Sequence, residues 1–183
     1  MSEQPLTVAA PAAAVTAAGV TLARFNDLDR VEAVALVRPC LDVDRWVDAV
    51  VDGRPYADLA ALVQSATEAS GSFTTEELGA ALAHHPRIGQ SADGSSKEAE
   101  LSRGEQAGLQ VDDDLSHRLR QGNAAYERRF DRIFLIRAAG RSAAEVLAAL
   151  ERRLENDDAT EDRVVGEQLG QIAVVRLNGL VSP

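Results

Sequence analysis

Near its C-terminal end the chain reads TEDRVVGEQLGQIAVVRLNGL, from Thr160 to Leu180. The apolar residues of this run recur at spacings of 4, 3 and 8, which places them on one face of an α-helix. They are Val165, Leu169, Ile172 and Leu180. Arg176 follows Ile172 by four positions and therefore lies along the same stripe. The run predicts a long helix that buries one face and carries an arginine within it.

The same helical period recurs over most of the chain upstream of this run. Two of the expected helix starts carry a capping box, in which a hydroxyl and a later carboxylate each bond the other residue's backbone N–H: Thr74 with Glu77, and Ser142 with Glu145. The expected helices cover residues 27–38, 42–52, 56–69, 74–84, 96–107, 112–130, 142–154 and 160–180.

The helices nearest the N-terminus are expected from their caps and prolines. Asp27 suits the N-cap of a helix that carries Leu28 and Val31 on its apolar face, and Pro39 ends that helix. Pro55 suits the first turn of the helix expected from residue 56.

The run Ile133-Phe134-Leu135-Ile136 is the one strand-like stretch, and four residues are too few for an independent sheet. The fold class predicted is therefore all-α: a single compact helical domain of about seven to nine helices, with one short extended segment near 133–138 that crosses the helical body. Residues 1–20 are Ala-rich and contain Pro5 and Pro11, which predicts a mobile N-terminal tail. Residues 21–183 form the predicted domain.

Composition excludes several kinds of partner. The formal net charge is -10 and the pI about 4.8, so neither nucleic acid nor an anionic membrane is expected to bind. Any site for an anion must carry local positive groups. Cys40 is the only cysteine, which excludes an intramolecular disulfide and a multi-cysteine metal site. No run of about 18 apolar residues and no signal peptide is visible, so a cytoplasmic protein is expected.

The first feature with possible chemistry is His84-His85-Pro86. Adjacent histidines point to different sides of a helix, so they do not form a metal-binding pair. The residue before a proline is disfavoured in a helix, which places His85 at a helix edge. Either His85 is simply a helix-end residue, or it faces a cleft as a general acid or base.

The second feature is Ser102, Glu105 and Gln106, which share one helix face. This face is either solvated or forms a hydroxyl, carboxylate and amide grip for a urea-like ligand. The third is Arg176, whose side chain either reaches solvent from its apolar stripe or presents a forked donor to a ligand carboxylate or carbonyl.

These features, in this order and with these gaps, resemble the 2-oxo-4-hydroxy-4-carboxy-5-ureidoimidazoline (OHCU) decarboxylase family. Three further motifs resemble its N-x-x-Y-x-x-x-F, R-L-x-N-D and I-x-x-x-R-L segments: Asn123–Phe130, Arg153–Asp157 and Ile172–Leu177. The likeness covers about Leu22–Val181, and the His85-Pro86-Arg87-Ile88-Gly89 form resembles a bacterial branch. One departure is Phe130-Asp131-Arg132-Ile133-Phe134, where many members read F-G-F-P-F.

The resemblance implies a cofactor-free and metal-free lyase, usually dimeric, that decarboxylates OHCU to (S)-allantoin in urate degradation. It implies that His85 is the catalytic histidine and that Glu105 acts in catalysis and substrate binding. It also implies a set of further substrate-binding residues: Ser102, Gln106, Pro86, Arg176 and the wall formed by Phe134, Leu135, Ile136, Arg137 and Ala138.

Two other classes of function remain open from the residues alone. A ureide amidohydrolase normally needs a metal or an activated nucleophile, and three histidines and one cysteine without ligand spacing do not favour it. A non-catalytic helical partner-binding module fits the apolar helices equally well, but it has no need of the histidine, carboxylate and arginine set.

Overall fold

The computed structural model describes residues 19–71, 73–83, 87–88 and 113–183. Within them the chain forms eight α-helices, one 3-10 helix and two short strands. The elements are β1 (Val20–Thr21), α1 (Leu22–Asp27), α2 (Arg30–Val37), η1 (Arg38–Cys40), α3 (Asp44–Asp52), α4 (Leu59–Ala69), α5 (Thr75–Leu82), α7 (Asp113–Phe130), α8 (Ala143–Arg153), α9 (Asp158–Leu180) and β2 (Val181–Ser182). The all-α prediction is confirmed.

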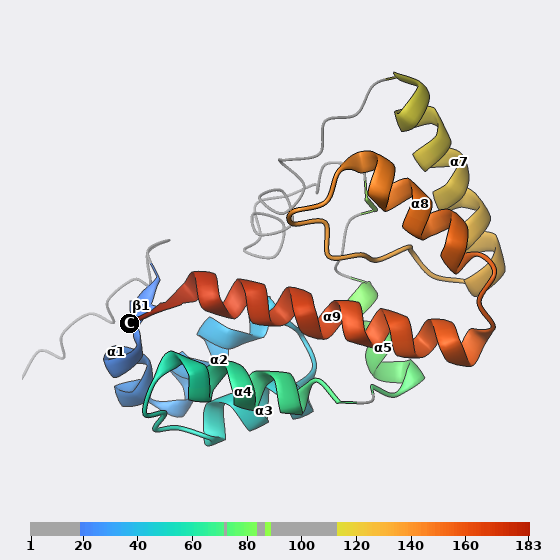
Figure 1. Cartoon of the computed structure of the whole chain (residues 1–183). Helices are drawn as coiled ribbons and strands as arrows, with labels where there is room; N and C mark the ends of the chain where they lie inside the picture. Colours follow the sequence, from blue (N-terminus) through green and yellow to red (C-terminus); the bar gives the residue numbers. More distant parts are fainter. Residues whose placement is uncertain (1–18, 72, 84–86, 89–112) are drawn as a thin grey trace, which may run out of the picture.

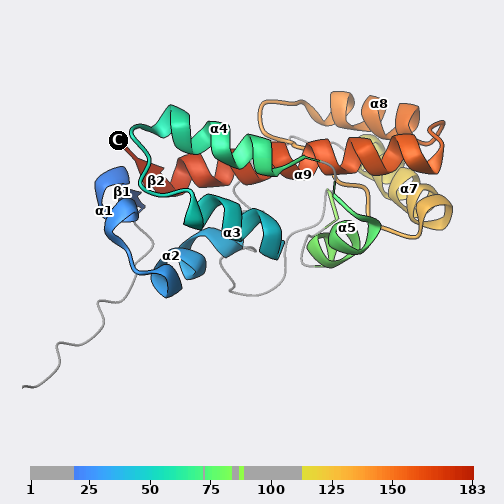
Figure 2. The same ribbon diagram turned by 90° about the horizontal axis from the view of Figure 1, so that it is seen from below.

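Helix α9 runs the length of the molecule (Figures 1 and 2), and α4, α5 and η1 pack directly against it. Helices α2, α3 and α4 lie along one half of α9, and α7 and α8 lie along the other half. Strands β1 and β2 pair in parallel with Val20 opposite Val181, so the two ends of the described chain lie side by side. Val20 therefore belongs to the folded domain, whereas the sequence analysis placed it in the tail.

The predicted helix caps account for the starts of the later helices. Both capping boxes form: the Thr74 hydroxyl accepts the Glu77 N–H while the Glu77 carboxylate accepts the Thr74 N–H, and Ser142 and Glu145 do the same. Helix α9 begins two residues before the predicted start, because the Asp157 carboxylate accepts the Thr160 N–H at 2.7 Å.

The N-terminal helix predicted from Asp27 is wrong in its boundaries. The chain forms two helices there, because Asp29 caps a new helix by accepting the Glu32 N–H at 2.8 Å. The restart rotates the apolar face, so Val31 is 79% exposed while Ala33 and Val37 are buried.

The helix predicted from residue 56 also begins later, at Leu59, where Asp58 caps it through the Ala61 N–H. Pro55 precedes the helix in a turn and follows a cis peptide bond. The turn is held by Asn26, whose side chain exchanges two hydrogen bonds of 2.9 Å with the Tyr56 backbone. This long-range contact is not visible in the local sequence pattern.

The buried side chains form two clusters, and the predicted extended segment 133–138 lies between them. One cluster gathers around Trp46 and Phe25 with the apolar stripe of α9. The other gathers around Tyr126 and Leu150 between α7 and α8. Side chains of the segment alternate between the two clusters, as an extended chain requires.

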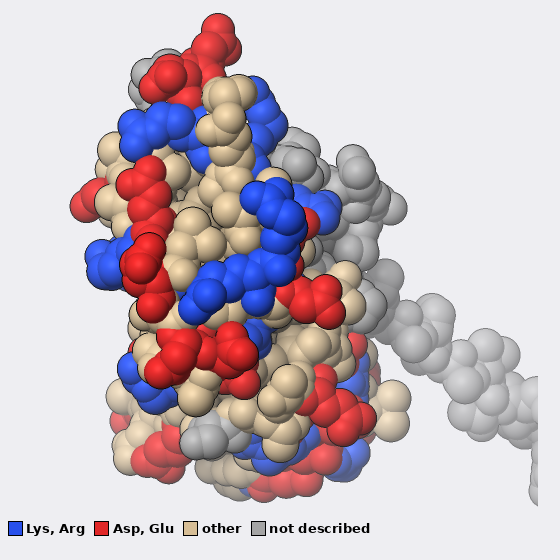
Figure 3. All heavy atoms as spheres, turned by 90° about the vertical axis from the view of Figure 1, so that its right-hand side faces the viewer, with Lys and Arg blue, Asp and Glu red and all other residues tan. Residues whose placement is uncertain are grey.

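The outer surface carries charges of both signs. On the face at the right-hand side of Figure 1, Lys and Arg side chains are interleaved with Asp and Glu (Figure 3). In the part of the chain that the structure describes, no helix combines the length and the apolar character that a membrane span needs.

Candidate active site

Five of the predicted site residues lie outside the described residues: His85, Pro86, Ser102, Glu105 and Gln106. Two parts of the predicted site are described, the wall segment from Phe134 to Ala138 and Arg176 on α9. Arg87 and Ile88, which directly follow Pro86, are described as well, although they are not predicted site residues.

Side chains from α8 and α9 hold one polar edge of the wall segment. The Arg153 guanidinium donates to the Leu135 carbonyl through Nη1 at 2.7 Å. Gln168 Oε1 accepts the Arg137 N–H at 3.0 Å, and Arg141 Nε donates to the Arg137 carbonyl at 3.1 Å. The backbone of the segment is thus fixed by side-chain partners instead of by a sheet.

A buried ionic network anchors Arg153 itself. Glu161, at the start of α9, is fully buried and accepts a hydrogen bond from Arg153 Nε at 2.8 Å. Asn156 Nδ2 donates to the other carboxylate oxygen at 2.7 Å, and the Tyr126 hydroxyl donates to Glu161 as well. Burial, followed by the hydrogen bond to this carboxylate, raises the pKa of Tyr126 well above its usual value. The Arg153 guanidinium also lies over the Phe134 ring, 4.6 Å from its centroid.

This network was not predicted from the sequence, although Arg153 and Asn156 belong to one of the motifs quoted above. One feature of the sequence does indicate a buried, paired carboxylate. Glu161 precedes Val165 by four positions and so extends the apolar stripe of α9 with a carboxylate. A charged residue in such a stripe is seldom buried without a partner.

Helix α7 holds the chain that directly follows Pro86. Asn123 Nδ2 donates to the buried Ile88 carbonyl at 3.1 Å. One turn later, Glu127 pairs with Arg87, with Nη2 donating to Oε2 at 2.9 Å. The hydrogen bond from Arg87 lowers the pKa of Glu127. Asn123 therefore holds the backbone of Ile88, and Glu127 holds the side chain of Arg87, in the two residues that directly follow Pro86.

Arg176 lies where the stripe of α9 predicts, and it is only 3% exposed. The interpretation that its side chain reaches solvent is therefore wrong. Its Nη1 donates to the Pro39 carbonyl in η1 at 3.4 Å. A buried guanidinium has a forked set of donors, which suits it to bind a carboxylate or a carbonyl.

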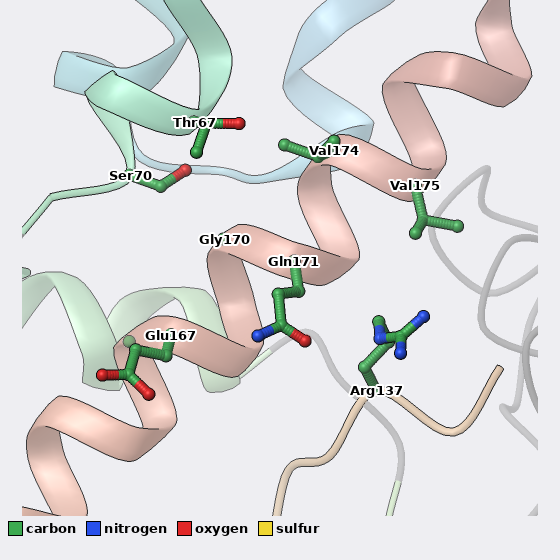
Figure 4. A pocket seen from close by; sticks show the side chains of 9 residues that line it. Thr67, Ser70, Arg137, Glu167, Gly170, Gln171, Val174 and Val175 are labelled. Carbon is green, nitrogen blue, oxygen red and sulfur yellow. The ribbon is translucent and has the colours of Figure 1, made fainter. Parts of the chain in front are cut away.

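A pocket of about 530 Å³ lies on another face of α9 (Figure 4). Thr67 of α4 and Ser70, which follows α4, line it together with a face of α9 and the side chain of Arg137. Arg137 lies across from Gln171 in this view. Of the predicted site residues, Arg137 lines this pocket and Arg176 does not, so the pocket does not bring the two arginines together. Most of the surface exposed in the pocket is apolar, although polar and charged side chains, among them Arg137, Glu167 and Gln171, also line it.

Within the described ranges, no group of three or more His, Cys, Asp or Glu residues is placed to hold a metal ion. The described polar groups of this region instead fix backbone segments.

Comparison with known proteins places the chain in a family. The sequence profile of OHCU decarboxylase matches residues 26–178. The chain belongs to the OHCU decarboxylase family. The family predicted from the motifs is therefore confirmed, and with it the class of enzyme, a carboxy-lyase.

Relatives of this OHCU decarboxylase family member agree with the assignment. The uric acid degradation bifunctional protein of Bacillus sp. (strain TB-90) is 25% identical over 160 residues, which are 85% of this chain and 31% of the relative. The chain thus spans less than a third of that protein.

Two solved structures share the fold. A crystal structure of OHCU decarboxylase in the presence of (S)-allantoin has a TM-score of 0.60 at 20% identity, covering 76% of this chain and 92% of the other. A structure of (S)-allantoin synthase has a TM-score of 0.66 at 18% identity, covering 88% and 54%. At these identities the likeness concerns the fold, and the roles of individual residues stay predictions.

Proposed function

We propose that this chain catalyses the decarboxylation of OHCU to (S)-allantoin in urate degradation. The observation that carries the proposal is the family match over residues 26–178, which is nearly all of the predicted domain 21–183. The names of the relatives support it, since one degrades uric acid, one is an OHCU decarboxylase and one makes (S)-allantoin.

The chemistry of OHCU explains how a protein without a cofactor can catalyse this step. The carbon that carries the carboxylate is bonded to an imine-like carbon, so the electron pair released as carbon dioxide leaves can spread into that bond. The substrate is its own electron sink, and we propose that neither an organic cofactor nor a metal is used. The protein then has to orient the breaking bond, stabilise the developing charge and deliver a proton to one face of the ring.

We assign proton transfer to His85, which acts on the ring hydroxyl or supplies the proton that sets the hand of the product. Glu105 orients His85 or accepts hydrogen bonds from ring N–H groups. The hydrogen bond from Asn123 to the Ile88 carbonyl supports this assignment, because it fixes the backbone three residues after His85, and Glu127 pairs with the side chain of Arg87.

Substrate binding is assigned to four further features. Ser102 and Gln106 bind the ureido and ring carbonyl groups, and Pro86 forms part of the wall. Arg176 counters the negative charge of the substrate, a role that its burial supports, because a cation interacts more strongly with an anion away from water. The backbone from Phe134 to Ala138 pairs with the polar edge of the ring.

The test generates OHCU in place, by oxidising urate with urate oxidase and hydrolysing the product with its partner hydrolase. Allantoin formation is followed by circular dichroism, which reports both rate and handedness. We expect the wild-type chain to give one enantiomer rapidly. His85→Ala should lower the rate by about 10²–10⁴-fold, leaving the racemic background reaction.

His117→Ala is the matched control, because His117 is an exposed histidine on α7. It should retain wild-type activity. If the wild-type chain matched the background rate, with and without added metal ions, the decarboxylase proposal would fail and the partner-binding module would take its place.

The role of Arg176 is tested by Arg176→Lys, which keeps the positive charge but loses the forked set of donors. This variant should raise KM more than Arg163→Lys, a control substitution at an exposed position of the same helix.

We further propose that the enzyme acts in the cytoplasm as a homodimer, as the resemblance implies. Light scattering on the purified chain tests the oligomeric state. A mass of one chain, 19.5 kDa, across the micromolar range would exclude the dimer.

A further inference from the structure

We propose that Gln168 and Arg153 are positioning residues that turn one polar edge of the wall segment 133–138 toward the substrate. The inference rests on the proposed function and extends it to two side chains that bond the backbone of the wall segment and are not assigned to substrate binding.

The segment is extended, and its packing shows the alternation directly. Phe134, Ile136 and Ala138 belong to the cluster between α7 and α8, whereas Ile133 and Leu135 pack into the cluster around α9. In an extended chain the N–H and C=O groups of residues i and i+2 point to the same edge, and those of residue i+1 point to the opposite edge. The backbone of the segment therefore has two distinct polar edges.

One edge is occupied by protein side chains. The Leu135 carbonyl accepts from Arg153 at 2.7 Å, and the Arg137 N–H donates to Gln168 at 3.0 Å. The two bonded backbone groups belong to odd-numbered residues of the segment, Leu135 and Arg137, so they share an edge. The two anchors come from different helices, α8 and α9, and fix the rotation of the segment about its own axis.

The opposite edge carries the N–H and C=O groups of Phe134 and Ile136. These residues are 1% and 7% exposed. Among the described residues, the hydrogen bonds of the segment use Leu135, Arg137 and Ala138, and none uses Phe134 or Ile136. A buried backbone N–H or C=O nearly always has a partner, because leaving it unpaired costs about 1 to 3 kcal/mol.

A ureide ring fits this edge. It offers N–H donors and carbonyl acceptors in alternation, and the edge offers C=O acceptors and N–H donors in alternation. With Gln168 and Arg153 in place, the edge is already oriented before the ligand arrives, which lowers the ordering cost of binding.

Gln168 is the better residue to test, because replacing Arg153 would leave the buried Glu161 carboxylate without its cation. Gln168→Met keeps the length of the side chain and removes the acceptor for the Arg137 N–H. Gln168→Glu keeps an acceptor oxygen at the same place. Gln64→Met is the matched control, because Gln64 is exposed on α4.

The measurements are KM and kcat from progress curves with OHCU generated in place, the enantiomeric excess of allantoin, and the Tm of each variant. We expect Gln168→Met to raise KM about 3- to 10-fold, equivalent to the loss of about one hydrogen bond, and to lower the enantiomeric excess. Gln168→Glu should restore both toward wild type, and Gln64→Met should change neither.

A merely structural role for Gln168 would lower the Tm and the active fraction while leaving KM and the enantiomeric excess unchanged, and that result would overturn the inference. The proposed function is tested separately by the wild-type chain. An inactive wild-type chain would remove both proposals, whereas an active wild type with an unaltered Gln168→Met variant would remove this inference alone.

Discussion

Arg153 at the end of α8 and Glu161 near the start of α9 form a buried ion pair, with Nε donating to Oε1 at 2.8 Å. Nη2 of the same guanidinium also donates to Oε1, at 2.5 Å, and Nη1 donates to the Leu135 carbonyl. The pair therefore joins three parts of the chain: two helices and the wall segment that passes between the hydrophobic clusters. It ties the geometry of the predicted pocket wall to the packing of the helices around it.

The first prediction concerns the energetic asymmetry of this pair. Arg153→Met should lower the free energy of unfolding by about 3 to 5 kcal/mol, because it leaves the Glu161 carboxylate buried without its cation. The double variant Arg153→Met/Glu161→Met should recover much of that loss, because it removes both charges and fills the space with apolar side chains. Urea unfolding followed by circular dichroism measures the three free energies.

Arg163→Met is the control for charge removal, since Arg163 forms an exposed i,i+4 pair with Glu167. Exposed pairs of this kind contribute about 0 to 1 kcal/mol. If the double variant were as unstable as Arg153→Met alone, the instability would not come from leaving the Glu161 carboxylate unpaired. The hydrogen bonds of the network themselves would then be required for folding.

Most of the fold follows from local sequence signals. The stripe of α9 and the boxes at Thr74 and Ser142 are local patterns, so their boundaries are predicted closely. The N-terminal region is predicted less well, because two acceptable caps, Asp27 and Asp29, lie within one helical turn. Tertiary packing of Phe25 in a separate short helix decides between them, and no local period reports that packing.

In the candidate site, too, features with a local sequence signal are predicted and long-range contacts are not. The place of Arg176 in the stripe of α9 follows from periodicity, but periodicity alone left open whether its side chain reaches solvent, and the structure shows that it is buried. The contacts of Arg153 with Glu161 and Leu135 join positions far apart along the chain or on different elements. Single-sequence periodicity assigns a residue to a face but does not say which residue lies opposite. The roles of His85, Ser102 and Glu105 remain predictions from the family resemblance.

A second prediction compares two helical glycines. A Cβ at Gly122 in α7 would lie 2.5 Å from Leu150 Cδ2 and 3.2 Å from its Cγ, and Leu150 is fully buried in α8. At the exposed Gly79 in α5, a Cβ meets nothing within 4 Å. Gly79→Ala should therefore stabilise the fold by about 0.5 to 1 kcal/mol through helix propensity.

Gly122→Ala should instead destabilise the fold by about 1 kcal/mol or more, because overpacking outweighs the gain in propensity. Thermal unfolding of both variants measures the effect. Stabilisation by both substitutions would mean that Leu150 moves aside at little cost and that α7 and α8 do not need the small residue.

The third prediction is a dependence of stability on pH through Glu77. Hydrogen bonds from Arg45, and then from the Thr74 N–H, lower the pKa of this carboxyl in the folded state. A carboxyl with a lowered folded pKa stabilises the fold above its unfolded pKa, and this contribution is lost as the pH falls through the folded pKa. The difference in Tm between wild type and Glu77→Gln should therefore be positive at neutral pH and shrink below about pH 4, the range of an ordinary Glu.

Arg45→Met separates the two causes of that shift. It removes the hydrogen bonds of 3.0 and 3.3 Å from Arg45 to Glu77 and leaves the capping box in place. The difference in Tm between Arg45→Met and Arg45→Met/Glu77→Gln should then depend less on pH, while the part due to the Thr74 N–H remains. An equal pH dependence in both backgrounds would assign the whole effect to the cap.

The last prediction concerns Asn123, which lies on α7 and donates a hydrogen bond to Ile88, three residues after the predicted catalytic histidine. Asn123→Ala removes the donor to the buried Ile88 carbonyl, which should lower the free energy of unfolding by about 1 to 2 kcal/mol. Because Ile88 lies two residues beyond Pro86, the loss should also loosen the placement of His85. If His85 transfers the proton, kcat should fall on the order of 10-fold, since small displacements of a catalytic group are costly.

The measurement is kcat and KM well below the Tm of the variant, so that the chain stays folded, with Asn178→Ala on an exposed part of α9 as the control. KM should change little, because Asn123 is not assigned to substrate binding, and this split distinguishes positioning from a general loss of folded protein. Glu127→Gln, which weakens the neighbouring grip on Arg87, should lower kcat in the same direction by a smaller factor, because Arg87 is exposed and its pairing is screened by water. An Asn123→Ala variant that loses stability but keeps the wild-type kcat would show that Ile88 is held for folding alone, and that His85 takes its position from contacts elsewhere in the chain.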